Sequence, residues 1–127
     1  MQPTAMVAMN PPAVTSQVDG GGIRVGLVTI QGEIVTLQVV NLTDQPVVLD
    51  RNAIKMVMPL GEQRTRFTTP LSNNVFGIPG GGIQLVRLHY DLTGVLDTDV
   101  VQLDFSDAIR RDGQPVAVPR FAYKPKA

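Results

Sequence analysis

The chain has 127 residues, of which 43% are hydrophobic and 17% are charged, and its 11 basic and 11 acidic residues give a formal net charge of +0. This composition fits one globular domain, and a balanced charge lacks the basic footprint of a nucleic-acid-binding protein. The absence of cysteine excludes thiolate catalysis, cysteine-ligated zinc and disulfides. No apolar run is long enough for a transmembrane helix, so the chain is not expected to span a membrane.

The first 22 residues differ in composition from the rest of the chain. They contain Pro3, Pro11, Pro12 and the run Gly20–Gly22, with Asp19 as the one charged residue. Prolines remove backbone donors and glycines add freedom, so residues 1–22 predict an extended N-terminal arm on a glycine hinge. The start also lacks the basic and apolar regions of a signal peptide. Either the protein is not exported by that route, or a leader has been removed.

Three interpretations of this arm stay open: a disordered tail, a first strand of its own sandwich, or a segment that pairs with a neighbouring subunit. An uncharged stretch between prolines suits addition to a sheet edge. The residues predicted to bind a partner in this way are Ala5, Met6, Val7, Ala8 and Met9.

Residues 23–127 predict one domain of about seven or eight short strands. Apolar and polar residues alternate within short segments separated by turn residues, a pattern typical of an antiparallel β-sandwich with one wet face per sheet. The expected strands cover 23–30, 33–41, 46–50, 54–58, 63–68, 82–90, 101–105 and 116–123. The expected core contains Val35, Leu37, Val39, Ile54, Met56, Val86, Leu88, Val101, Leu103 and Phe105.

The segment 63–68 is polar and predicts an edge strand. Its Arg64 and Arg66 are expected to alternate outward and to contact a partner protein. The stretch 69–81 contains prolines, asparagines and glycines and is expected to be irregular. A single helical turn at 106–111 is the one helix candidate, because Asp112 and Gly113 stop it.

Two motifs carry a family resemblance. VTLQVVNLTDQPVVL resembles the strand–turn–strand of immunoglobulin-like envelope and periplasmic domains, and GIPGGGIQLVRLHYDL resembles the step that precedes their penultimate core strand. Over roughly Ile23 to Tyr123, the chain is similar to an immunoglobulin-like domain of unknown function found in bacterial lipoproteins and secreted proteins. The resemblance implies an immunoglobulin-like antiparallel β-sandwich with a binding or structural role and no catalytic residues.

The residue inventory offers little for catalysis or cofactor binding. His89 is the only histidine, and its position in the middle of a strand favours a solvent-facing side chain over a general base. Met56 and Met58 share one strand face, which favours a core role over copper binding. The aspartates around 91–99 and 104–112 lie in consecutive loops, which place them at opposite ends of a sandwich and argue against a shared calcium ion. We therefore expect no enzyme activity, no cofactor and no metal.

The expected function is a non-catalytic structural or protein-binding module. It would assemble with copies of itself or with scaffold subunits through edge strands and the N-terminal arm, and a homo-oligomer is one such form. A cell envelope or surface fibre, in the periplasm or on the cell surface, is the expected place if a leader was removed. The alternative is a virion decoration or capsid-stabilising protein.

Overall fold

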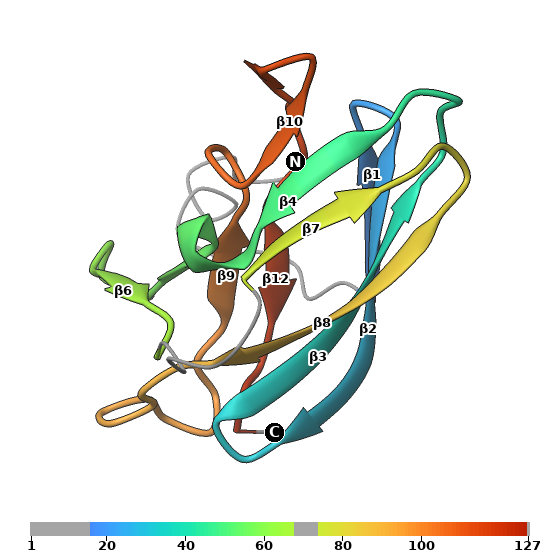
Figure 1. Ribbon diagram of the computed structural model, residues 1–127. Helices are drawn as coiled ribbons and strands as arrows, with labels where there is room; N and C mark the ends of the chain where they lie inside the picture. Colours follow the sequence, from blue (N-terminus) through green and yellow to red (C-terminus); the bar gives the residue numbers. More distant parts are fainter. Residues whose placement is uncertain (1–15, 68–73, 127) are drawn as a thin grey trace, which may run out of the picture.

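The computed structural model describes residues 16–67 and 74–126, and the structural statements below refer to these residues. They form twelve strands and one short 3-10 turn, η1 (Arg51–Ala53). The strands make three antiparallel sheets of four, so the prediction of an all-β antiparallel fold is confirmed (Figure 1). The number of strands exceeds the seven or eight expected, because several short strands lie in segments that were expected to be loops.

The first sheet contains the longest strands, in the order β1-β2-β3-β8. Its strands are β1 (Gln17–Gly20), β2 (Ile23–Gln31), β3 (Ile34–Asn41) and β8 (Ile83–His89). Along β3 the side chains alternate between buried and half-buried, because successive residues of a strand point to opposite faces. This period places Val35, Leu37 and Val39 inside, as predicted.

The second sheet has the order β11-β10-β4-β7. Its strands are β4 (Val47–Asp50), β7 (Val75–Ile78), β10 (Ile109–Arg111) and β11 (Gln114–Pro115). Two of these correct the expectations: β7 lies in the stretch expected to be irregular, and β10 occupies the place of the helix candidate. Both are short and end beside turn residues, so they show almost no alternation in the sequence.

The third sheet has the order β12-β9-β5-β6. Its strands are β5 (Lys55–Val57), β6 (Gln63–Thr65), β9 (Val101–Asp104) and β12 (Phe121–Tyr123). The polar strand β6 pairs only with β5, so it is an edge strand as predicted.

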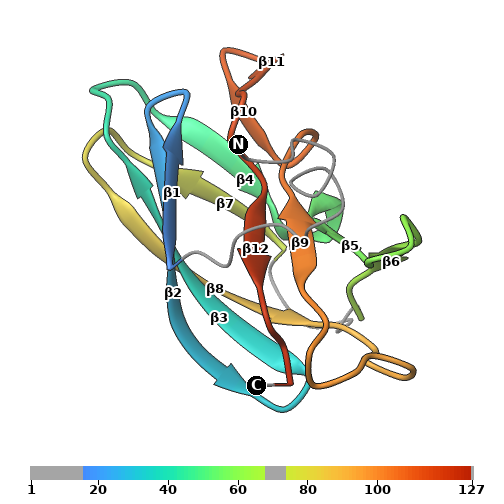
Figure 2. The same ribbon diagram turned by 180° about the vertical axis from the view of Figure 1, so that it is seen from behind.

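The sheets enclose one hydrophobic core. In Figure 1 the strands β7, β8 and β3 lie in front of β9 and β12, and Figure 2 brings β12 and β9 forward from behind. All ten residues predicted for the core are buried. Tyr90 adds a buried aromatic ring whose hydroxyl donates a 2.7 Å hydrogen bond to the carbonyl of Ile54, which satisfies the one polar group that this ring carries.

The glycine run at 20–22 is a turn and not a hinge. Residues 17–20, which the sequence analysis placed in the arm, form β1 and pair with β2. Gly21 and Gly22 have φ angles of 60° and 77°, which favour glycine and close a tight hairpin. The predicted partner-binding stretch from Ala5 to Met9 lies outside the described residues.

Candidate functional site

Among the described residues, the outer edge of β8 has no partner strand. β8 is the last strand of its sheet, and it pairs only with β3. The amide of Asn41 bonds to the carbonyl of Gly82, and the amide of Tyr90 bonds to the carbonyl of Glu33. Backbone groups of alternate residues face opposite sides of an antiparallel strand. Even-numbered residues therefore face β3, and the N–H and C=O groups of Ile83, Leu85, Arg87 and His89 face away from it.

Three carbonyls on this outer edge have partners of other kinds. The Arg87 carbonyl accepts a hydrogen bond from the Arg51 guanidinium at 3.3 Å, and the Leu85 carbonyl accepts one from the Gln84 side chain at 2.9 Å. The His89 carbonyl accepts from the Phe67 amide at 2.8 Å. The end of the edge near His89 is therefore covered, whereas no described residue pairs with or caps the amides of Ile83 and Leu85.

Apolar side chains project from the same part of β8. Ile83 is 59% exposed and Leu85 is 56% exposed. Ile83 lies opposite the half-buried Val40 of β3, so the three apolar side chains share the outer face of the sheet. An exposed apolar edge strand is a template for pairing with another chain. We call the segment 83–87, with its backbone groups and side chains, the β8 edge.

The two arginines predicted to point outward do not both do so. Arg66 is 7% exposed, because the alternation of β6 continues to it and places it on the same face as Arg64. Arg64 lies opposite the buried Met56, so this face points inward and not outward. Arg64 is half-buried, and its guanidinium donates to the carbonyls of Asp91 and Thr93. Arg64 thus fastens β6 to the loop after β8. A role of either arginine in partner binding stays a prediction.

Arg66 belongs to a cluster with Arg51. The Arg66 guanidinium donates to the side-chain oxygens of Asn52 and Asn74, and Arg51 donates to the same oxygen of Asn74. The two bonds to Asn74 are each 3.0 Å long. The Arg51 guanidinium also stacks on the ring of Phe76, 5.6 Å from its centroid. Burial, together with the charge of Arg51, lowers the pKa of Arg66.

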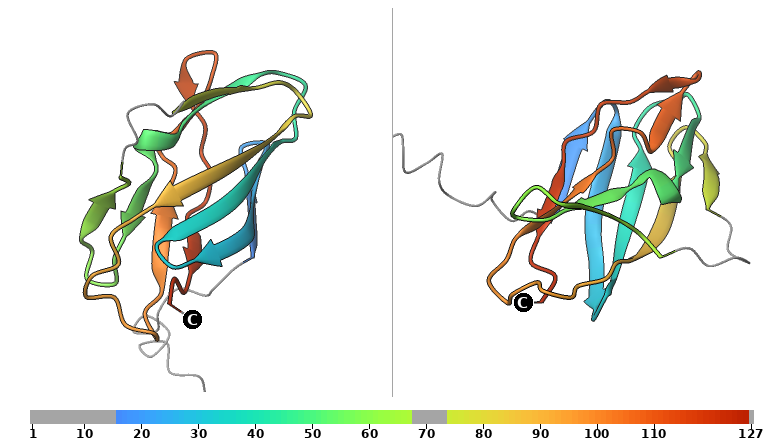
Figure 3. Two further views of the ribbon diagram at one scale, coloured as in Figure 1. Left: turned by 60° about the horizontal axis from the view of Figure 1, so that its bottom comes forward. Right: turned by 90° about the vertical axis from the view of Figure 1, so that its left-hand side faces the viewer.

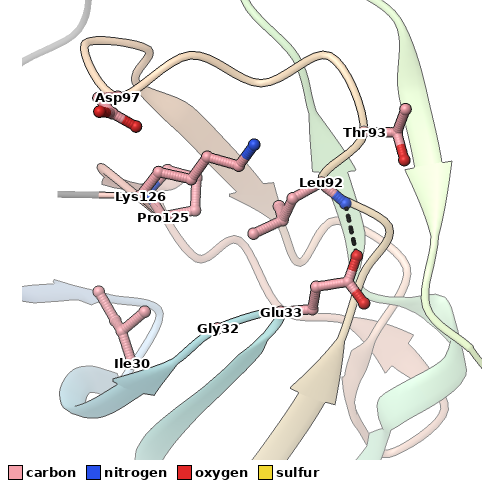
Figure 4. A pocket seen from close by; sticks show the side chains of 8 residues that line it. All are labelled: Ile30, Gly32, Glu33, Leu92, Thr93, Asp97, Pro125 and Lys126. Atoms are coloured by element: carbon pink, nitrogen blue, oxygen red, sulfur yellow. Dashed lines mark hydrogen bonds between the residues drawn. The ribbon is translucent and has the colours of Figure 1, made fainter.

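A hollow of about 600 Å³ lies at the end of the molecule where the β2–β3 turn, the loop after β8 and the C-terminal segment meet (Figure 4). Pro125 and Lys126 face Leu92 across it, and Asp97 stands at its rim. Ile30 extends the apolar wall. Its size falls within the range of ligand pockets.

Glu33 anchors one side of this hollow. Its carboxylate accepts a 3.0 Å hydrogen bond from His89 and a 3.1 Å bond from the Leu92 amide. These two bonds lower the pKa of Glu33, and the bond from His89 has the larger effect. His89 also packs against Phe67, with 4.6 Å between ring centroids. Its side chain is 43% exposed. Among the described residues its side-chain contacts are the Glu33 carboxylate and the Phe67 ring, an arrangement that joins the β2–β3 turn to β8.

The described residues contain no group of three or more potential metal ligands. The aspartates of the two loops are used locally: Asp91 accepts from the amide and hydroxyl of Thr93, and Asp104 accepts from the amide of Ser106. Asn41 is likewise occupied in its own turn, since its oxygen accepts from the amide and hydroxyl of Thr43. These bonds are those of turn-forming side chains.

The β8 edge is absent from the sites predicted from the sequence, although the sequence carries a signal for it. With Val86 and Leu88 placed inside, Ile83 and Leu85 fall on the face that should be polar. In the part of the chain that the structure covers, no helix is long and apolar enough to cross a membrane. Comparisons of the chain with family models, curated proteins and solved structures find no match.

Proposed function

We propose that the chain is a non-catalytic protein-binding module that assembles with other subunits through its sheet edges and its N-terminal segment. The first partner we propose is a second copy of the same chain. The observation that supports this is the β8 edge, which combines a strand edge without a neighbouring strand among the described residues with two exposed apolar side chains, Ile83 and Leu85. A strand added there would gain backbone hydrogen bonds and place cross-strand neighbours beside both side chains.

Three of the other edges, those of β11, β6 and β1, support such pairing less well. β11 has two residues, one of them Pro115, which cannot donate a backbone hydrogen bond. β6 is polar and is fastened by Arg64 to the loop after β8. At the end of β1, a side chain at Gly20 would collide with Pro119, so a neighbouring segment already lies beside that edge. We take β8 as the acceptor edge because it presents two exposed apolar side chains, Ile83 and Leu85.

The same proposal assigns the chain to immunoglobulin-like sandwiches of a cell envelope or surface fibre, with a virion decoration or capsid-stabilising protein as the alternative. Short antiparallel strands around one core support the coarser part of this assignment. The uncharged stretch from Ala5 to Met9 is the segment we propose as the added strand.

Sedimentation velocity of the full chain over a wide concentration range tests the proposal. Leu85→Lys places a charge on the β8 edge, which natural proteins use to block pairing. Leu60→Lys is the matched control, because Leu60 is 98% exposed at the β5–β6 turn, on a hairpin that stands out from the body in Figure 3. We expect the parent and Leu60→Lys to associate and Leu85→Lys to stay monomeric. A parent chain that remains monomeric, or an equal effect of both variants, would overturn the proposal.

A further inference from the structure

The Arg66 guanidinium is buried without a carboxylate beside it. The four salt bridges among the described residues join Arg24 to Asp19, Arg64 to Glu62, His89 to Glu33 and Arg120 to Asp104. None includes Arg66. Residues 1–15 and 68–73 lie outside the described part of the chain, and they contain no aspartate or glutamate. The chain therefore supplies no acidic side chain for Arg66.

A buried charge normally has a counter-charge, because transfer from water into the protein interior is costly. Arg66 has two neutral amide oxygens instead, and it shares that of Asn74 with a second arginine, Arg51. Its Nε is buried and makes no hydrogen bond. The cluster thus holds two like charges around one amide oxygen and leaves one donor of Arg66 unused.

The surroundings of this cluster are those of a protein contact. Asn52, Phe67 and Arg87 lie around it and are exposed, and the Phe67 side chain is apolar. Arginine and aromatic residues are enriched where interfaces gain most of their binding energy, and buried anchors are surrounded by a rim that excludes water.

We infer that the Arg51–Arg66 cluster binds a carboxylate from a partner protein, an aspartate or glutamate side chain. A carboxylate has two oxygens, which match the fork of a guanidinium. It would neutralise the like charges of the two guanidinium groups. This inference rests on the proposed function as a protein-binding module, and it names the chemistry that a partner must bring to this part of the surface.

The test is an NMR titration of the full chain with sodium glutarate, which follows the Nε–H resonance of Arg66. Sodium chloride at matched ionic strength and sodium phosphate are run in parallel. We expect glutarate to shift the Arg66 resonance saturably and chloride to leave it unchanged. Arg66→Lys keeps the charge but loses the fork, so the same titration followed on the Asn74 side-chain amide should show affinity weakened by about tenfold or more. Arg24→Gln, which removes a surface ion pair, should titrate like the parent.

An Arg66 resonance that ignores glutarate while the chain stays folded would overturn the inference. A shift with phosphate and none with glutarate would overturn the carboxylate assignment. If Arg66→Lys does not fold, Arg51→Gln takes its place, with the Arg66 resonance as readout. An unchanged affinity of Arg51→Gln for glutarate would contradict a site that both arginines share. The titration does not depend on self-association. Saturable glutarate binding by a chain that stays monomeric in sedimentation would therefore support this site while overturning assembly through β8.

Discussion

The side-chain amide of Asn41 donates a 3.2 Å hydrogen bond to the carbonyl of Ile78 and thereby joins the end of β3 to the end of β7. The same nitrogen also donates to the carbonyls of Gln45 and Pro79. Asn41 is fully buried, so these bonds replace water at the point where the first and second sheets come together. One side chain therefore holds together the turn between β3 and β4 and the turn between β7 and β8.

Asn41→Asp should destabilise the chain by about 1–3 kcal/mol. Aspartate has nearly the same shape, but it cannot donate to the three carbonyls and would place a negative charge beside them. Urea unfolding followed by circular dichroism measures the change. Gln63→Glu on the exposed β6 is the control and should have little effect. Equal stability of the Asn41→Asp variant and the parent would contradict the role of this turn.

Leu37→Ala and Leu103→Ala should each lower the free energy of unfolding by about 2–5 kcal/mol, since both side chains are fully buried and leave cavities. Leu60→Ala should change it by less than about 0.5 kcal/mol, because Leu60 is exposed at a turn. Chemical denaturation of the three variants makes the comparison. A small loss at Leu37 or Leu103 would mean that the inner and outer faces of that strand have been exchanged.

The two tyrosines should stay un-ionised until the chain unfolds in alkali. Burial raises the pKa of Tyr90 and Tyr123 above the ordinary value of 10.0. Because the unfolded chain loses these protons first, the stabilisation is complete below that ordinary value and declines as the pH rises above it. Absorbance of the phenolate and far-ultraviolet circular dichroism should therefore change together. Ionisation with the native circular dichroism retained would show that the rings are accessible.

Glu33 should stabilise the fold in a pH-dependent way. Its pKa is lowered from 4.5 by the hydrogen bonds from His89 and Leu92. A lowered carboxyl pKa contributes stability that is fully present above the ordinary value and is lost as the pH falls through the folded value. The difference in melting temperature between the parent and Glu33→Gln should thus shrink on acidification. Asp97→Asn at the rim of the same hollow is the control, and a difference that stays constant down to about pH 2 would contradict this account.

Strand alternation made the fold predictable where strands are long and have one wet face. β3 and β8 obey the two-residue period over most of their length, so Val35 to Val39 and Val86 to Leu88 were placed inside correctly. The short strands β7 and β10 are not predictable in this way, because three or four residues beside turn residues show no clear alternation. The glycine run at 20–22 is compatible with a flexible hinge and with a hairpin turn, because glycine allows both flexibility and a positive φ. Only the pairing of β1 with β2 shows that it is a hairpin turn.

The candidate site was harder to predict than the core. The polar sequence of β6 predicts Arg64 and Arg66 on the outer face, but the strand presents this face inward, and Arg66 donates to Asn52 and Asn74. These contacts join residues that lie between strands, outside the alternating segments, so no local sequence pattern predicts them. The exposed position of Leu85 could be deduced from alternation, whereas the lack of a strand beside it depends on the order of the whole sheet.

Hydrogen exchange at the amide of Leu85 tests the central claim most directly. This amide faces away from β3, on the side of β8 that has no partner strand, so it should exchange rapidly in a dilute sample. We predict that exchange at Leu85 slows as the concentration of the full chain rises, while the amides of the β5–β6 turn exchange at an unchanged rate. Self-association that leaves exchange at Leu85 unchanged, or that protects another edge instead, would contradict assembly through β8.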